Sequence, residues 1–247
     1  MARDFESSGA NQYLSIDSAS VSAYPFSFSC WINVESQVAN MAPFWIGDKD
    51  VTNNYHWISL AGGNLYIESR NTSLTGASVS YTPSNGTWAF IAGVWASATS
   101  RKIYLNGSST TAEGTTSVLF GSADRMTIGR AGDSSPDRYF DGLIAEAGFW
   151  DIALTTAEID SLAKGFSPLC IRTASLLNYW NLLGNNSPET DIVGGFNLTL
   201  AGTPAVAPHP RIIYPSVAQI RRFTTVGGAP ATSVKDIIGS GFIPFAR

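Results

Sequence analysis

The chain has 247 residues, of which 14% are charged and 12% are aromatic, and its formal net charge at pH 7 is −4. This balance gives no reason to expect binding to nucleic acid, and no apolar run approaches the length of a membrane-spanning helix, so membrane insertion is not expected. The length suits one large all-β domain with an appendage, because β-sandwiches of about 200 to 250 residues often form a single domain.

The N-terminal residues contain no apolar core of the kind found in secretory signal peptides, so the sequence favours synthesis in the cytoplasm without export. Residues 13–16 and 24–34 are expected to form strands. Apolar and polar residues alternate in the second segment, which places Cys30 on a buried face. With Cys170 as the second cysteine, no disulfide framework is indicated. The residues predicted to share the face of Cys30 are Phe26, Phe28, Ile32 and Val34.

Short apolar segments separated by polar turns continue through the first half of the chain. The pair Asn106 and Gly107 is the strongest short turn signal, because these residues adopt the positive backbone angles of tight hairpin turns. Regularly spaced segments of this kind predict an antiparallel all-β fold. The predicted strands are residues 43–47, 55–60, 64–68, 87–96, 102–105 and 118–120.

Residues 126–165 have the most definite pattern in the chain. They predict a strand at residues 126–129, a polar loop at residues 130–138 and a second strand at residues 143–150. Strict alternation would divide the side chains of the second strand between two faces. One face would carry Leu143, Ala145, Ala147 and Phe149, and the other Ile144, Glu146, Gly148 and Trp150.

A short helix is expected next. Thr155 is a good N-cap, and Glu158 three residues later completes the pattern of a capping box. Gly165 is expected to end the helix. A further strand is predicted at residues 176–183.

The phrase FDGLIAEAGFWDIALTTAEI at residues 140–159 resembles the laminin-G-like branch of the concanavalin A-like lectin and glucanase superfamily. The phrases YLSI at residues 13–16, IYLNG at residues 103–107 and DIVGGFNLTL at residues 191–200 resemble the same family. The resemblance covers about residues 1–202 and implies a concanavalin A-like jelly-roll β-sandwich of two antiparallel sheets with one short helix. It does not identify the function, because this scaffold hosts many activities.

Residues 203–247 differ in composition and are predicted to form an extended C-terminal arm. The segment is rich in proline, which disfavours helices and central strands, and it is too apolar for a solvated linker. It should therefore lie against something, either as a strap on its own sandwich or as an arm on a neighbouring subunit. The residues proposed for assembly are Arg211, Tyr214, Arg221, Arg222, Phe223, Phe242 and Phe245.

No catalytic array is predicted, so the protein is not expected to be an enzyme. The resemblance includes glucanases, which carry paired carboxylates on one strand. The nearest match here begins at Glu158, but it lies in the predicted helix and ends with Ala163 in place of the last carboxylate. The two histidines, His56 and His209, have no serine in a nucleophile-elbow context.

The resemblance also raises calcium and sugar binding, because related lectin-like domains often use both. No cofactor is required, and calcium is a possible ligand of loop oxygens, although turn geometry explains the same loop residues and is favoured. The candidate calcium ligands are Asp48, Asp50, Asn54, Asp133 and Asp137. The candidate sugar platform consists of Trp45, Tyr55, His56, Trp57 and Tyr66.

These observations lead to three functional hypotheses. The first is a structural protein of a virus particle, a decoration, cement or fibre-associated subunit that docks through residues 203–247 onto virion proteins or copies of itself. The phrase HPRIIYPSVAQIRRF at residues 209–223 resembles the ends of laminin-G-like proteins from bacteriophage and environmental sequences. The second is a free carbohydrate-binding lectin of cell-surface glycans, with or without calcium. The third is a divergent glycosidase.

Overall fold

The computed structural model describes residues 2–7, 11–36, 40–108, 110–184 and 186–215. The chain divides into two units, Met1–Ile213 and Tyr214–Arg247. Only residues 214 and 215 of the second unit are described, so the fold below is that of the first unit.

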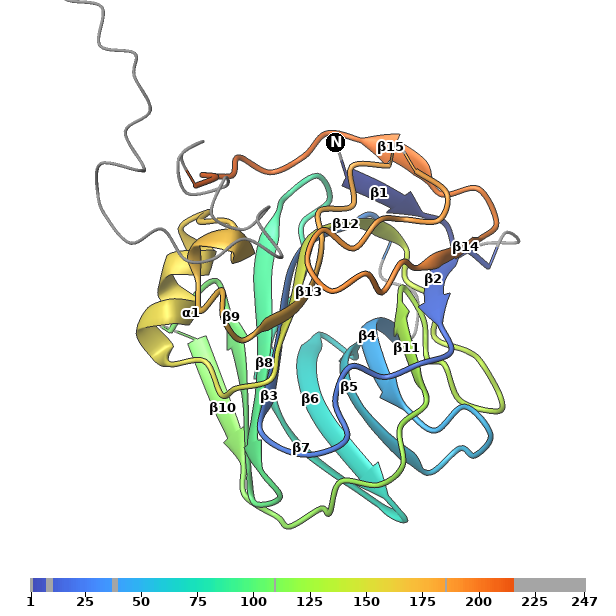
Figure 1. The fold of residues 1–247 in the computed structure, drawn as a ribbon, viewed down its shortest axis with the longest axis vertical. Coiled ribbons are helices and arrows are strands. Elements are labelled where there is room, and N and C mark those ends of the chain that lie inside the picture. Colours follow the sequence, from blue (N-terminus) through green and yellow to red (C-terminus); the bar gives the residue numbers. More distant parts are fainter. Residues whose placement is uncertain (1, 8–10, 37–39, 109, 185, 216–247) are drawn as a thin grey trace, which may run out of the picture. The chain divides into compact units, whose positions relative to one another are not determined.

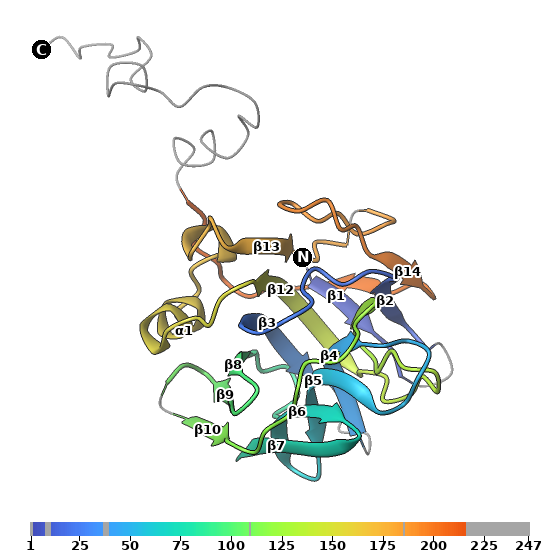
Figure 2. The same cartoon turned by 60° about the horizontal axis from the view of Figure 1, so that its bottom comes forward.

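Two antiparallel sheets form a jelly-roll sandwich, as the sequence predicts (Figures 1 and 2). In order across sheet A, the described strands are β10 (Thr110–Gly114), β9 (Ser100–Leu105), β8 (Ala89–Ser97), β3 (Phe26–Val34), β12 (Gly142–Trp150), β1 (Ala2–Phe5) and β15 (Ala205–Ala207), with β13 (Leu176–Trp180) also paired to β12. In order across sheet B, they are β14 (Thr199–Ala201), β2 (Tyr13–Ile16), β11 (Arg125–Ile128), β4 (Asn40–Gly47), β5 (Asn54–Ala61), β6 (Asn64–Asn71) and β7 (Ser73–Ser80).

The main core lies between the two sheets. Inward side chains of β3 and β4 meet there, with the rings of Phe28 and Phe44 stacked at a centroid distance of 3.9 Å. Cys30 is 0% exposed and belongs to this cluster with Phe26 and Ile32. The burial predicted for Cys30 from alternation is therefore confirmed.

We expect Cys30→Ser to lower the free energy of unfolding by about 1 to 3 kcal/mol, because a hydroxyl would replace the thiol in an apolar site with no assured partner. Urea titration measures this loss. Cys170→Ser is the matched control and should change stability little, since Cys170 is only half-buried. Burial raises the pKa of the Cys30 thiol well above its usual value, so rapid labelling of this thiol in the native protein would contradict the burial.

The alternation predicted for residues 143–150 is wrong, because a β-bulge interrupts β12. Its pairing with β3 changes register between Ala145 and Gly148, and Glu146 adopts a positive φ of 57°. An extra residue in one strand reverses the faces that follow it. As a result Ile144 and Phe149 both point into the main core, although strict alternation would put them on opposite faces.

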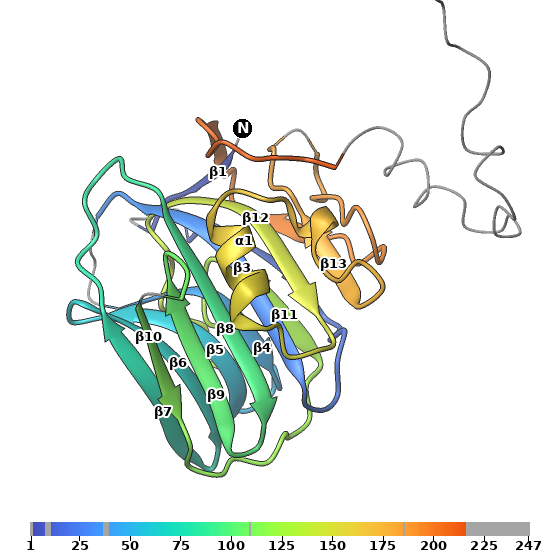
Figure 3. The same ribbon diagram turned by 90° about the vertical axis from the view of Figure 1, so that its left-hand side faces the viewer.

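Helix α1 (Thr156–Ala163) confirms the predicted capping box. The Thr155 side chain accepts a hydrogen bond from the backbone N–H of Glu158, while Glu158 accepts one from the backbone N–H of Thr155. Ile159 and Leu162 are buried against the outer face of sheet A, and Gly165 follows the helix with a φ of 91°. Figure 3 shows α1 lying across this face. No described helix is long and apolar enough to cross a membrane.

Residues 203–213 belong to the sandwich, which places the end of this unit at Ile213 and not at the predicted boundary after residue 202. β15 pairs with β1, so that Arg3 lies opposite Val206. The Arg3 guanidinium also donates to the Pro204 carbonyl oxygen at 3.2 Å. We call residues 203–213 the strap. The sequence leaves two alternatives open for the predicted arm, a strap on its own sandwich or an arm on a neighbouring subunit. Residues 203–213 correspond to the first of these.

Candidate functional site

The outer face of sheet B is the candidate functional site. The outer face of sheet A is largely occupied, because α1 and the 3-10 helix η1 (Pro168–Cys170) pack on it through a second apolar cluster. On sheet B, by contrast, the outer face carries aromatic and charged side chains from β4, β5 and β6, next to the loop of residues 130–139.

Four residues of the predicted sugar platform lie on this face, namely Trp45, Tyr55, Trp57 and Tyr66. Trp45, Tyr55 and Trp57 form one cluster, with ring centroids 6.4 Å apart for Trp45 and Tyr55 and 4.7 Å apart for Tyr55 and Trp57. Their exposed fractions are only 0%, 5% and 4%. They form the floor of the site, and a ligand would meet few of their atoms directly.

The loop of residues 130–139 covers this floor. A Cβ on Gly132 would lie 2.9 Å from the Trp45 ring, so glycine permits the loop to pack directly on it. At the far end of the loop, the Arg138 guanidinium lies 4.8 Å from the centre of the Trp57 ring. Arg138 has a positive φ of 56°, and its carbonyl accepts a hydrogen bond from Ala42 N at 2.9 Å. The partly exposed guanidinium is thus held over the tryptophan by the backbone.

Strand β6 supplies partly exposed groups beside the floor, namely Tyr66, Glu68 and Arg70. They lie on one face because strand residues two apart point the same way. Glu68 Oε2 accepts hydrogen bonds from Trp57 Nε1 at 2.7 Å and from Ser59 Oγ at 3.1 Å, which fixes the carboxylate in place.

The charges on this face are mixed. Asp137 pairs with Arg138 at 3.5 Å. Burial raises the pKa of Asp133, and the negative charge of Asp137 adds to this, whereas Arg138 and Arg70 act in the opposite direction. Burial also raises the pKa of Tyr55 against the opposing effect of Arg70. Fixed donors and acceptors next to aromatic rings are suited to a polar ligand with apolar patches.

The placement of His56 on the platform is wrong. On β5 it points into the sandwich, away from Tyr55 and Trp57, and it is 2% exposed. Its Nδ1 lies 2.8 Å from Ser69 Oγ, and burial and the nearby Arg101 charge lower the pKa of His56 to about 3. It is a neutral core histidine.

Sequence reasoning did not select Glu68, Arg70 or Arg138. The alternation of Tyr66, Glu68 and Arg70 along β6 was a usable signal, because it places an aromatic ring and two charges on one face. Nothing local to Arg138 indicates its position over Trp57, which depends on the packing of a loop far along the chain.

The proposed calcium ligands lie in two loops. Carboxylate oxygens of Asp48, Asp50 and Asp124 come within 4.8 Å of one another. However, Lys49 Nζ lies 2.5 Å from Asp124 and 3.3 Å from Asp50, so one ammonium group already pairs with two of these three carboxylates. Calcium binding stays a prediction. The partners of the other candidates are Ser122 for Asp48 and Asn54, Ser135 for Asp133 and Arg138 for Asp137.

A second acidic group was not foreseen. Oxygens of Asp4, Glu6 and Glu35 lie within 4.8 Å of one another on the outer face of sheet A. Burial, with a smaller effect from the negative charge of Asp141, raises the pKa of Asp4. Glu35 is far from Asp4 and Glu6 in the sequence, and the pairing of β1 and β3 with the same strand, β12, brings it near them.

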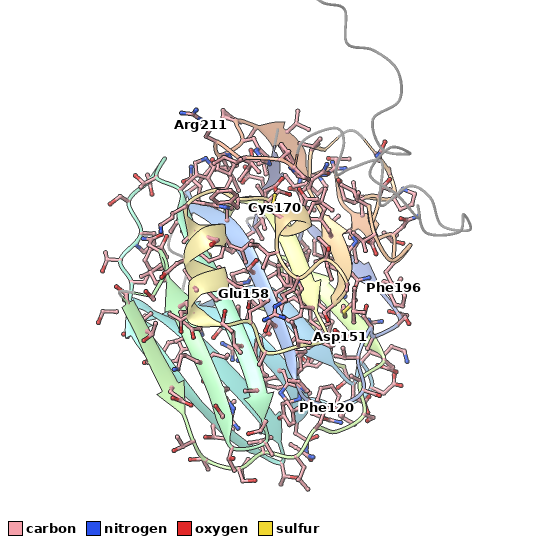
Figure 4. The ribbon with its side chains drawn as sticks, turned by 60° about the vertical axis from the view of Figure 1, so that its left-hand side comes forward. Phe120, Asp151, Glu158, Cys170, Phe196 and Arg211 are labelled. Carbon is pink, nitrogen blue, oxygen red and sulfur yellow. The ribbon has the colours of Figure 1, made fainter. Side chains whose placement is uncertain are left out.

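A shallow hollow of about 340 Å³ lies elsewhere, lined by residues 19–25 and Asp151. Asp151 is labelled in Figure 4. The lining is mostly small side chains and Asp151 is its one charged residue, so the hollow offers few groups for recognition.

Of the residues proposed for assembly, Arg211 and Tyr214 are described, and both are exposed. The others lie outside the described residues, namely Arg221, Arg222, Phe223, Phe242 and Phe245.

Comparisons with known proteins agree with the jelly-roll fold. The sequence profile of the laminin-G-like group described as the concanavalin A-like lectin/glucanases superfamily matches residues 8–160. No curated protein shows significant sequence similarity to the chain.

Solved structures with a similar fold include the following three. The heptameric SAP-like pentraxin of Limulus polyphemus is 17% identical, with a TM-score of 0.54 over 66% of this chain and 81% of that one. The CBM40 of the Ruminococcus gnavus IT-sialidase is 13% identical, with a TM-score of 0.52 over 57% and 84%. A candidate carbohydrate-binding protein of Bacteroides ovatus is 21% identical, with a TM-score of 0.61 over 86% and 61%. At these identities the likeness concerns the fold alone.

Proposed function

Because the chain belongs to the concanavalin A-like lectin/glucanases superfamily, we propose that it is a non-enzymatic carbohydrate-binding protein that uses the outer face of sheet B. The contact residues are Tyr66, Glu68, Arg70 and Arg138. The observation that carries this proposal is the Arg138 guanidinium fixed over Trp57 beside the anchored Glu68 carboxylate.

The chemistry of this face suits a sugar. A sugar ring presents an apolar C–H face and a rim of hydroxyl groups, so it is recognised by an aromatic ring together with charged hydrogen-bonding groups. Tyr66 offers the ring, Glu68 accepts from hydroxyl groups, and Arg70 and Arg138 donate to them. The Ruminococcus CBM40 has been solved with α2,3- and α2,6-sialyllactose, which makes these glycans reasonable first ligands to try.

The absence of catalysis is part of the proposal. A glycosidase needs a pair of carboxyl groups placed on either side of the scissile bond. Glu158, in the glucanase-like phrase, is instead a capping residue that also pairs with Arg172. Glu68 is held by Trp57 and Ser59 as a hydrogen-bond acceptor.

We expect Arg138→Ala and Tyr66→Ala each to weaken glycan binding by at least about tenfold. Arg138→Ala removes a hydrogen bond from a charged group, which contributes about 1.5 to 3 kcal/mol, and Tyr66→Ala removes the aromatic ring on which the apolar face of the sugar would pack. Binding is first measured on a glycan panel that includes both sialyllactoses, and then by calorimetry. Lys102→Ala is the matched control, since it removes a positive charge from β9 on the other sheet.

The experiment tests carbohydrate binding and the location of the binding site separately. If no glycan on the panel binds, carbohydrate binding is contradicted. If a glycan binds wild type and both site variants equally well, the function stands and the outer face of sheet B is the wrong site.

The structural role in a virus particle stays a prediction, and with it the virion location and virion partners. No described residue favours that role over glycan binding. Residues 203–213, the first part of the proposed docking arm, are bound to the sandwich of the same chain, so any docking would rest on later residues.

A further inference from the structure

The bulge in β12 buries a carboxylate on the outer side of sheet A. Glu146 is 2% exposed, and its Oε2 accepts a hydrogen bond from Tyr179 Oη at 2.6 Å. Ser167 Oγ in turn donates to Tyr179 Oη at 3.4 Å. A buried carboxylate is stable only with such partners, because its transfer from water is costly.

His209 of the strap brings an imidazole to the other oxygen of this carboxylate. His209 Nε2 lies 3.2 Å from Glu146 Oε1, and the two side chains are 14% and 1% exposed. The contact does not have the geometry of a good hydrogen bond, so its strength depends mainly on charge.

His209 lies in a part of the strap where backbone hydrogen bonds to the sandwich are interrupted. The β15 ladder with β1 ends at Ala207, and His209 stands between Pro208 and Pro210, which have no backbone N–H to donate. Backbone hydrogen bonds resume at Ile213, whose N–H donates to Gly165 O at 2.7 Å and whose carbonyl accepts from Ser167 N at 3.0 Å. The contact with Glu146 therefore lies in the gap between two backbone anchors.

Both imidazole nitrogens of His209 face acceptors. Nδ1 lies 2.8 Å from the Pro210 carbonyl oxygen, which can only accept, so Nδ1 carries a proton. Nε2 faces the Glu146 carboxylate. A neutral imidazole would present its lone pair to that oxygen, whereas an imidazolium satisfies both contacts and adds attraction between opposite charges.

We propose that the strap is a pH-sensitive closure, in which protonated His209 holds residues 203–213 against the sandwich through Glu146. The attraction between the two side chains requires a positively charged imidazolium opposite a negatively charged carboxylate. Histidine is the side chain that ordinarily changes charge between about pH 5 and 8. The attachment of residues 203–213 to the sandwich would then depend on pH.

The neighbouring groups do not provide an alternative switch in this range. Tyr179 on β13 and Ser167 lie behind the carboxylate as hydrogen-bond donors. The Cys170 thiol faces the strap at Ile213 O, and burial raises its pKa. Along the strap, Arg3 on β1 is already paired with Glu189 at 2.8 Å. Figure 4 labels Cys170 and Arg211 in this part of the molecule.

Hydrogen exchange of the full chain at about pH 5.5 and pH 8, corrected for intrinsic exchange rates, tests the proposal. We expect the protection of the Ile213 and Ser167 amides to fall about tenfold or more at the higher pH, the loss expected when one charge-assisted contact is removed. Amides of the β3–β8 pair should not change. The chain has two histidines, and the other one, His56, does not titrate here because its pKa is about 3.

His209→Gln is the decisive variant, because glutamine keeps a donor for Glu146 but has no charge to lose. Its strap protection should be the same at both pH values. Glu146→Gln keeps an acceptor for Tyr179 and should also remove the pH dependence. An unchanged protection in wild type, or an equal loss in His209→Gln, would overturn the proposal.

Discussion

Replacing Asp191 with alanine is expected to lower the free energy of unfolding by about 3 to 5 kcal/mol, the largest effect of any single substitution considered for this protein. Asp191 is 5% exposed. Its Oδ1 accepts from the backbone N–H groups of Tyr179 and Val193, at 2.9 and 3.0 Å. Its Oδ2 accepts from Asn178 Nδ2, Gly194 N and Phe196 N at 2.8, 3.1 and 3.0 Å.

The size of this effect follows from the donors that would lose their acceptor. Each buried donor left without a partner costs about 1 to 3 kcal/mol, although water entering the space reduces the sum. The carboxylate also ties the loop after residue 190 to β13, so its loss would loosen the loop as a unit. Asparagine offers a single acceptor oxygen and would place an NH₂ group against N–H donors, so Asp191→Asn should recover little of the stability.

Thermal melting and urea titration measure this loss. A melting temperature lower by roughly 6 to 20 °C is expected, since 1 kcal/mol corresponds to about 2 to 4 °C in a domain of this size. Asp50→Asn is the charge-matched control, because the Asp50 side chain is 75% exposed. An Asp191→Ala variant that melts within about 2 °C of wild type would contradict the structural role given to this carboxylate.

Asp191 also illustrates which features of the fold can be predicted from the sequence and which cannot. The phrase at residues 191–200 indicates the family and the all-β sandwich, because motif and alternation are local patterns. The sequence does not reveal that one carboxylate collects five hydrogen bonds, since its partners come from β13 and from the loop that Asp191 itself organises. The bulge at Glu146 has the same origin, because only the register of β12 against β3 reveals the extra residue.

The candidate site likewise has features that the local sequence pattern predicts and others that depend on the packing of distant segments. Alternation along β5 puts Tyr55 and Trp57 on the outer face, and the same rule puts His56 between them on the inner face. The predicted platform treated these three consecutive residues as one surface and therefore included His56 wrongly. Burial of Trp45 and Trp57 under residues 130–139 could not be predicted, because that loop follows them by more than seventy residues. Exposed aromatics are therefore better sought after the loops have been placed on the sheet.

The second large effect is expected from shortening the chain. A chain ending at residue 202 should lose at least about 3 kcal/mol of unfolding free energy, because it loses several contacts of the strap with the sandwich at once, among them that of His209 with the buried Glu146 carboxylate. The deletion also removes β15 from the edge of β1, the Pro204 carbonyl from Arg3, and the hydrogen bonds of Ile213. Chemical and thermal unfolding measure this loss.

A chain ending at residue 215 is the matched control and should melt close to the full-length protein, because it keeps the whole strap and all of the first unit. Equal stability of all three chains would show that the strap contributes nothing to the sandwich. A loss of stability in the 215-residue chain would mean that residues 216–247 support the fold directly.

The same pair of chains separates the strap from assembly. A chain cut at residue 202 loses both the strap and the proposed docking residues, so its failure to associate would not distinguish an unstable sandwich from a missing arm. The chain ending at residue 215 keeps the sandwich intact while lacking Arg221, Arg222, Phe223, Phe242 and Phe245. If full-length protein forms oligomers or joins particles in light scattering and co-sedimentation and the 215-residue chain does not, those later residues carry the association. If both associate equally, the arm hypothesis is wrong and the contact surface must lie on the sandwich.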